Sequence, residues 1–69
     1  MKNRLEELRK TRGISQADLG LVLEVSRQTI ISLEKGRYNP SLMLAFKISR
    51  YFDQPIEAIF LDEEGETTQ

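Results

Sequence analysis

Helix caps divide this sequence so regularly that they constrain its fold more than any other feature does. Ser15, Ser26 and Ser41 each stand directly before a stretch whose apolar residues recur at helical spacing, and serine is a preferred residue for capping the start of a helix. Asp18, three residues after Ser15, completes the pattern of a capping box. Because the apolar residues follow a helical rather than an alternating period, the sequence predicts an all-α fold.

The caps and the apolar pattern together predict five helices in a compact bundle. Their expected bounds are residues 2–12, 16–23, 27–35, 42–52 and 56–61. Gly13 is suited to stop the first helix, whose Leu5 and Leu8 face inward. Pro55 is suited to the start of the short fifth helix, since proline is tolerated in the first turn.

The fourth expected helix is apolar on several faces. Its apolar residues are Leu42, Leu44, Ala45, Phe46, Ile48 and Phe52. A helix that is apolar most of the way round is usually buried, so we expect the other helices to pack around this one.

The chain has 69 residues, of which 30% are charged and 39% hydrophobic, as expected of one small globular domain. It has no cysteine and no histidine, which excludes disulfide scaffolds, Cys/His zinc sites and histidine-based catalytic triads. No apolar run approaches the roughly 20 residues of a membrane span, and the first residues are unlike a secretory signal. We therefore expect a cytoplasmic protein with a domain over residues 1–61 and a frayed acidic tail over 62–69.

Charge is distributed unevenly along the chain. Residues 1–50 hold all ten basic residues and five acidic ones, whereas residues 51–69 hold six acidic residues and no basic one. Such asymmetry is typical of a protein whose basic part binds an anionic partner. Ordinary solubilising charge is an equally good interpretation of the charges alone.

Residues 16–36 have the dimensions of a helix-turn-helix, in which a tight turn at Glu24 and Val25 joins two short helices. Gly20 stands where the crossing of the two helices would require a small residue. At about 100° per residue, Ser26, Ile30 and Leu33 gather on one side of the helix that follows the turn. The opposite, outward side carries Arg27, Gln28, Ile31, Ser32 and Lys35.

This outward side has the chemistry to read DNA bases. Arginine can bridge two acceptors of guanine, and glutamine can pair with adenine in the major groove. Arg27 and Gln28 lie in the first turn of the helix, which is the part of a recognition helix that enters the groove. From this helix alone, a solvated polar face is the alternative.

Residues 4–60 resemble the Cro/phage-repressor helix-turn-helix family, also called the XRE family, and its compact stand-alone members in particular. The matching segments are residues 5–9, 13–16, 25–30, 33–36, 39–42, 55–57 and 59–60. The resemblance implies a prokaryotic, sequence-specific DNA-binding transcriptional regulator located at the nucleoid. It further implies a homodimeric repressor that reads a palindromic operator through the helix at 26–35, with no cofactor or metal.

The resemblance also implies roles for individual residues in binding DNA. The base-reading positions match Arg27, Gln28 and Ser32, and the phosphate-contacting positions match Gln16, Arg37, Tyr38 and Asn39. Contacts of the second kind position a protein on the duplex, whereas the first kind specify the sequence. Arg4 and Arg12 are either further phosphate contacts or members of exposed salt bridges.

Two further pairs of residues receive structural roles. Arg9 and Glu34 match an ion pair between the first and third helices of the family. Phe60 and Leu61 are the expected dimer contact, because the short fifth helix carries more apolar residues than it can easily bury.

The chain departs from the family pattern at several positions. Glu24 and Asp53 stand where glycine is common, and a left-handed backbone is strained for glutamate. Leu21, Val22 and Ile31 replace small or polar residues, which favours an alternative function as a protein-interaction module or antitoxin-like subunit. An enzyme is the least favoured class, because no acidic pair, phosphate-binding loop or activated nucleophile is evident.

Overall fold

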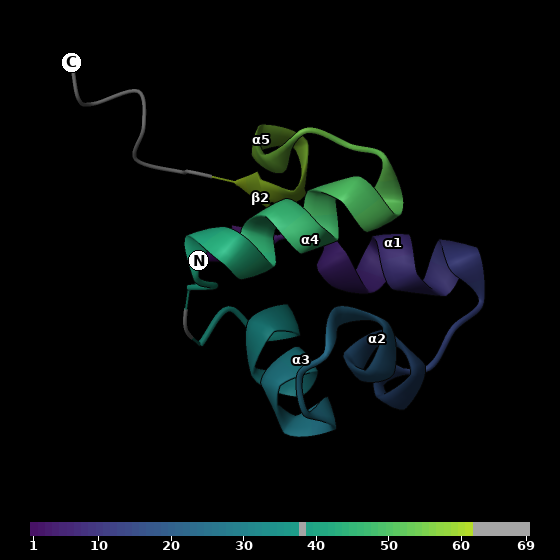
Figure 1. Ribbon diagram of the computed structural model, residues 1–69. Coiled ribbons are helices and arrows are strands. Elements are labelled where there is room, and N and C mark those ends of the chain that lie inside the picture. The colour runs from purple at the N-terminus through teal and green to yellow at the C-terminus, as the bar shows by residue number, and fades with distance from the viewer. Residues whose placement is uncertain (38, 62–69) are drawn as a thin grey trace, which may run out of the picture.

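The computed structural model describes residues 1–37 and 39–61, within which five helices and two very short strands follow one another (Figure 1). The elements are β1 (Lys2–Asn3), α1 (Leu5–Arg12), α2 (Gln16–Leu23), α3 (Arg27–Glu34), α4 (Leu42–Phe52), α5 (Ile56–Ile59) and β2 (Phe60–Leu61). The expectation of an all-α, five-helix fold is therefore confirmed. The acidic tail expected over 62–69 and the role expected for Tyr38 lie outside the described residues.

The predicted caps define the helix ends. The side chains of Ser15, Ser26 and Ser41 each accept a hydrogen bond of 3.0–3.1 Å from the backbone N–H three residues later. The Asp18 carboxylate accepts a bond of 3.3 Å from the backbone N–H of Ser15, which completes the capping box. Gly13 ends α1 in the left-handed conformation with φ at 71°, as predicted.

The two ends of the chain differ from the prediction. The helix expected over 2–12 begins at Leu5, and the helix expected over 56–61 ends at Ile59. Residues 2–3 instead pair antiparallel with residues 60–61, so that Lys2 lies opposite Leu61 and Asn3 opposite Phe60. The Asn3 side chain also accepts a hydrogen bond of 3.0 Å from the Leu5 backbone N–H. This bond, like a cap, favours a helix start after Asn3 rather than before it.

The core gathers residues from all five helices and β2. Its buried apolar members are Leu5, Leu19, Leu23, Ile30, Leu33, Leu44, Ala45, Ile48, Phe52, Ile59 and Phe60. Among the described residues, every buried polar side-chain atom has a hydrogen-bond partner. The core of the described residues therefore contains no unsatisfied polar side-chain atom.

The expectation that α4 is enclosed by the other helices is wrong. Leu44, Ala45 and Ile48 are buried, but Leu42 is 68% exposed and Phe46 40% exposed. The helix packs mainly against α2 and α5, and the apolar residues on its other side stay exposed. An apolar pattern on all sides does not distinguish a central helix from a helix with an unpartnered face.

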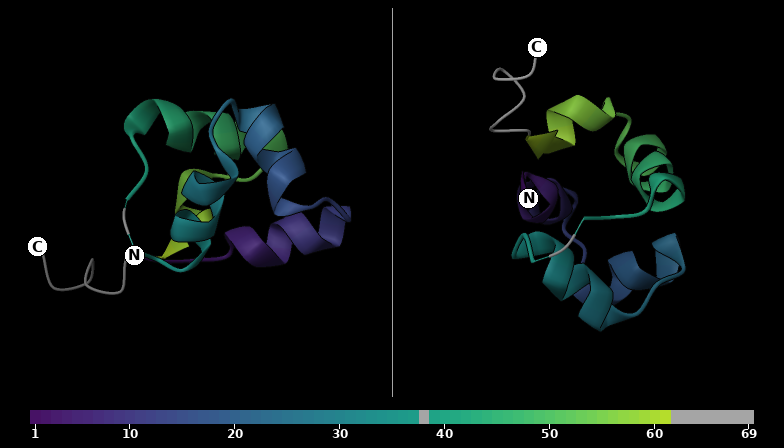
Figure 2. Two further views of the ribbon diagram at one scale, coloured as in Figure 1. Left: turned by 90° about the horizontal axis from the view of Figure 1, so that it is seen from below. Right: turned by 90° about the vertical axis from the view of Figure 1, so that its left-hand side faces the viewer.

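The crossing of α2 and α3 requires a glycine. A Cβ atom on Gly20 would lie 2.8 Å from the carbonyl oxygen of Val25, in the turn between these helices. The small residue predicted at this crossing is thus needed because the chain itself returns against α2. In Figure 2, α2 and α3 lie next to each other, below α1 and α4 in the right-hand view.

Candidate nucleic-acid interface

The two sides of α3 differ sharply in burial. Ile30 and Leu33 are fully buried and fix the helix to the core, whereas Arg27 and Gln28 are exposed. Within the described part of the chain, neither Arg27 nor Gln28 makes a side-chain hydrogen bond or ion pair. The first turn of α3 therefore presents a free guanidinium and a free amide to solvent, as base readout would require.

The remainder of the outward side is less open. Ser32 and Ile31 are half-buried, and Lys35 is exposed. Ser32 also uses its backbone carbonyl to accept a bond of 3.0 Å from the Arg37 N–H. Ser32 thus lies deeper in the surface than Arg27 and Gln28, one turn further along the helix.

The loop after α3 presents polar side chains beside this helix. Gly36 turns the chain with φ at 71°, and Arg37 and Asn39 on either side of Tyr38 are exposed. The Arg37 guanidinium has no ion-pair partner in the described residues. It is free to contact a phosphate, although the backbone N–H of the same residue is already bonded within the turn.

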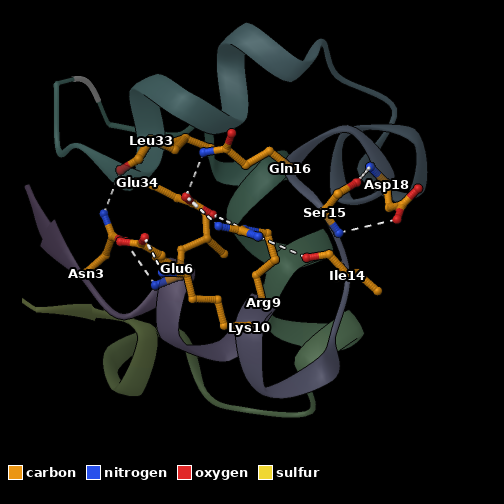
Figure 3. A network of polar contacts seen from close by, with 11 residues as sticks. Asn3, Glu6, Arg9, Lys10, Ile14, Ser15, Gln16, Asp18, Leu33 and Glu34 are labelled. Carbon is orange, nitrogen blue, oxygen red and sulfur yellow. Dashed lines mark hydrogen bonds and ion pairs between the residues drawn. The ribbon is translucent and has the colours of Figure 1, made fainter.

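A buried ion pair joins α1 to α3, and Gln16 belongs to the same network (Figure 3). Arg9 Nε lies 2.6 Å from Glu34 Oε2, and Arg9 Nη1 donates a 2.9 Å bond to the carbonyl of Ile14. The Gln16 amide nitrogen donates a 3.1 Å bond to Glu34 Oε1. Hydrogen bonding to Glu34 raises the pKa of Arg9 above its usual value. The structure thus has the ion pair expected between Arg9 and Glu34, while the bond to Gln16 was not foreseen.

The two remaining candidate phosphate contacts are both engaged within the chain. Arg4 donates hydrogen bonds to Glu7, with an N–O distance of 3.2 Å, and to the Ala58 carbonyl at 3.3 Å. The bond from Arg4 lowers the pKa of the exposed Glu7. The Arg12 guanidinium stacks 4.7 Å from the centre of the Tyr51 ring. For Arg4 the structure favours the salt bridge, and Arg12 instead packs on an aromatic ring.

Glu24 adopts the left-handed conformation expected from the position it occupies, with φ at 65°. Its carboxylate accepts a 2.9 Å hydrogen bond from Lys47 Nζ on α4, and this bond with the lysine charge lowers the pKa of Glu24. The acid in the turn is therefore paired. The sequence offered no signal for this pairing, because the two residues are 23 positions apart.

Phe60 and Leu61, the residues of the expected dimer contact, differ in exposure. Phe60 is 7% exposed and belongs to the core, whereas Leu61 is 36% exposed. Phe60 also lines an apolar groove of about 640 Å³, whose other lining residues are Met1, Asn39, Pro40, Leu42, Ala45, Ile56 and Glu57. The sequence did not indicate this groove because its walls come from separate segments: Met1, the loop before α4, α4 itself, α5 and β2.

The outer side of α2 carries a second apolar surface. Leu21 is 79% exposed, and Val22 and Ala17 are also exposed.

No group of three or more acidic side chains with the arrangement of a metal site occurs in residues 1–37 and 39–61. No helix in these ranges is long and apolar enough to cross a membrane.

Two short helices in contact across a tight turn, with one free polar side on the second helix, define a helix-turn-helix DNA-binding domain. Comparison with known proteins leads to the same class. A family model described as a helix-turn-helix matches residues 5–59. The chain belongs to this family, the XRE-type helix-turn-helix proteins that the sequence resembles, and it is a transcriptional regulator.

Relatives of similar length carry the same description. The chain is 53% identical over 66 residues to an uncharacterized HTH-type transcriptional regulator of Methanocaldococcus jannaschii, covering 96% of this chain and all of the relative. It is 48% identical over 66 residues to one from Bacillus subtilis, covering 94% of this chain and all of that protein. Both relatives are prokaryotic, and both are described as helix-turn-helix transcriptional regulators.

A solved structure shares the fold. The restriction-modification controller protein C.AhdI from Aeromonas hydrophila superimposes with a TM-score of 0.73 at 32% sequence identity. The match covers 83% of this chain and 86% of the controller protein. The helical arrangement of this chain is therefore that of a known helix-turn-helix controller.

Proposed function

We propose that this regulator is a homodimeric repressor that reads a palindromic operator by inserting α3 into the major groove. The observation that carries the proposal is the free first turn of α3. Arg27 and Gln28 are exposed without partners, while Ile30 and Leu33 hold the helix rigidly from behind. A rigid helix with two unengaged, base-matching side chains loses little conformational freedom when it binds.

In this proposal, side chains around α3 supply the phosphate contacts. Arg37 and Asn39 in the following loop, Tyr38 between them, and Gln16 at the start of α2 contact the DNA backbone, and Ser32 approaches a base one turn beyond Gln28. These contacts would make the affinity fall steeply as the salt concentration rises, because each neutralised phosphate releases counterions.

The apolar groove supports the proposed dimer. Leu42 and Phe60 line the groove, and Leu61, which follows Phe60 in the chain, is exposed. A second copy that covers this surface about a two-fold axis would place two copies of α3 about 34 Å apart, one helical turn of DNA. A dimer bound in this way would repress by occupying the promoter, at the chromosome in the cytoplasm.

The test is selection of bound duplexes from a random pool, followed by titration of the selected site. We expect a palindromic motif with two half-sites. Arg27→Ala should cost about 1–3 kcal/mol and relax the preference at one base position in each half-site. Arg37→Ala should weaken all sequences alike and reduce the salt dependence by about one ion per subunit. If both variants weaken every sequence equally, α3 does not read bases.

The apolar surface on α2 favours a second candidate, a protein-interaction module on the same fold. Leu21 and Val22 are exposed with no cover from the described chain, and Ile31 is only half-buried. This candidate predicts co-purification of a partner protein that Leu21→Ser abolishes. It also predicts that no duplex is enriched in the selection.

A further inference from the structure

The network around Glu34 links the core of the protein to a residue on its proposed DNA-binding side. Glu34 lies at the end of α3, and its side chain is 4% exposed. It receives three donors: Arg9 Nε at 2.6 Å, Arg9 Nη2 at 3.3 Å and Gln16 Nε2 at 3.1 Å. Figure 3 shows the carboxylate between the guanidinium on one side and the Gln16 amide on the other.

We propose that Glu34 is a positioning residue for DNA binding, which holds the side chain of Gln16 ready to contact a phosphate. The inference rests on the proposed function and extends it to a residue that touches no DNA itself. Its basis is the 3.1 Å bond between Gln16 and Glu34, which joins the first residue of α2 to the last of α3.

The chemistry of the bond fixes the orientation of the amide. An ionised carboxylate only accepts hydrogen bonds, so the Gln16 side chain must turn its NH2 group toward Glu34 and its oxygen away. One N–H of that group is used by Glu34, and the other remains for an outside acceptor. A phosphate is such an acceptor. An unrestrained glutamine would have to lose its rotamer freedom on binding, whereas Gln16 has already lost it in the free protein.

Arg9 makes this arrangement compatible with a nearby phosphate. Its guanidinium pairs with both oxygens of Glu34, so the carboxylate charge is balanced where it is buried. The same guanidinium holds the Ile14 carbonyl at 2.9 Å, directly before the capping box that starts α2. Arg9 thus fixes the backbone from which Gln16 projects, and Glu34 fixes the side chain.

The first experiment is a double-mutant cycle in the full chain with Gln16→Ala and Glu34→Gln, using fluorescence anisotropy with the selected duplex. An amide has one acceptor oxygen for three donors, so in Glu34→Gln the bond to Gln16 or a bond to Arg9 must break. We expect each single variant to bind DNA about 2- to 10-fold more weakly. The double variant should bind no more weakly than Gln16→Ala alone, because Glu34 acts through Gln16.

Glu7→Gln is the matched control. It removes the same charge from an exposed glutamate on α1, and removing an acid by itself favours binding to a polyanion. We therefore expect Glu7→Gln to bind DNA equally or more tightly, opposite in direction to Glu34→Gln. Circular dichroism at the assay temperature establishes that each variant is folded. The proposal is overturned if Glu34→Gln weakens DNA binding equally in the wild-type and the Gln16→Ala background. It is also overturned if Glu34→Gln does not weaken DNA binding at all.

A second experiment needs neither DNA nor a variant. The side chains of Gln28 and Gln54 are exposed and make no hydrogen bond within the described residues, so they serve as internal references. In the NMR spectrum of the free protein, we expect the side-chain amide protons of Gln16 to exchange with water more slowly than theirs. Equal exchange would refute the held amide even if Glu34→Gln fails to fold. If the unmodified protein shows no salt-dependent DNA binding, the proposed function is refuted. Slow exchange of the Gln16 amide protons would still show that this side chain is held.

Discussion

Replacing Gly20 by alanine tests whether the crossing of α2 and α3 is as tight as the structure indicates. The added Cβ would lie 2.8 Å from the Val25 carbonyl oxygen and 3.4 Å from the Arg27 backbone nitrogen. Both are backbone atoms, so rotation of a flexible side chain cannot relieve the clash. The Val25 N–H also donates a 2.9 Å bond back to the Gly20 carbonyl, and the turn cannot retreat without stretching it.

Two opposing effects set the size of the change. Alanine inside a helix is favoured over glycine by about 1 kcal/mol. Forcing a methyl group into packed surroundings costs about 1–3 kcal/mol, and weakening the bond from Val25 adds up to about 1 kcal/mol. The net expectation is a loss of about 1–2 kcal/mol, or a fall in Tm of roughly 5–15 °C for a domain of this size.

The assay is thermal unfolding followed by circular dichroism, together with DNA titration well below the transition. Gly13→Ala is the matched control, since a Cβ on Gly13 would meet nothing within 4 Å but the φ of 71° strains any other residue. We expect a loss of about 1 kcal/mol for this control, with DNA affinity unchanged. Gly20→Ala should also weaken DNA binding, because α3 must move. A higher Tm for Gly20→Ala would show that the crossing has room and would refute the reasoning.

Three further outcomes follow from the ion pairs and the groove. Glu24→Gly should raise the urea midpoint of unfolding, because relief of the left-handed strain exceeds the loss of an exposed pair with Lys47. A lower urea midpoint would contradict this. The pKa values of Glu6 and Glu24 are held below 4.5 by hydrogen bonds from Lys10 and Lys47, so the stability that they contribute is present above about pH 4.5 and lost as the pH falls through the lowered pKa values. Urea midpoints between about pH 7 and pH 3 should decline in this direction, and less so at high salt. Leu61→Glu should shift the protein toward monomer in sedimentation analysis, because it places a charge on the exposed apolar residue of the proposed dimer contact. If the wild-type protein is a dimer and the variant has the same mass, the interface lies elsewhere.

Most of the helical framework was predictable because its signals are local. A serine cap such as Ser15 and a glycine stop such as Gly13 act within four residues of themselves, and both fall where the sequence placed them. The separation of the two sides of α3 follows from helical spacing alone. The resemblance to a known family supplied the ion pair between Arg9 and Glu34, which spacing by itself does not reveal.

What the sequence did not indicate depends on contacts between distant segments. The pairing of β1 with β2 joins residues almost sixty positions apart, and two-residue strands leave no periodic pattern. The exposure of Leu42 depends on which faces of α4 find a neighbour. The bond between Gln16 and Glu34 spans 18 positions. In the sequence, a glutamine and a glutamate at these positions look like ordinary surface residues, so nothing marks them as a pair.

The pairing of β1 with β2 makes the described chain nearly a closed ring. Lys2 and Leu61 are opposite each other at the end of the ladder, so replacing Met1 and residues 62–69 by a two-residue linker such as Asn-Gly would join them as a β-hairpin. The ring could then be opened at the exposed Asp53 to Pro55 segment between α4 and α5. Such a circular permutant would keep every helix and place both chain ends between α4 and α5, which makes this fold a suitable carrier for domains attached at that point.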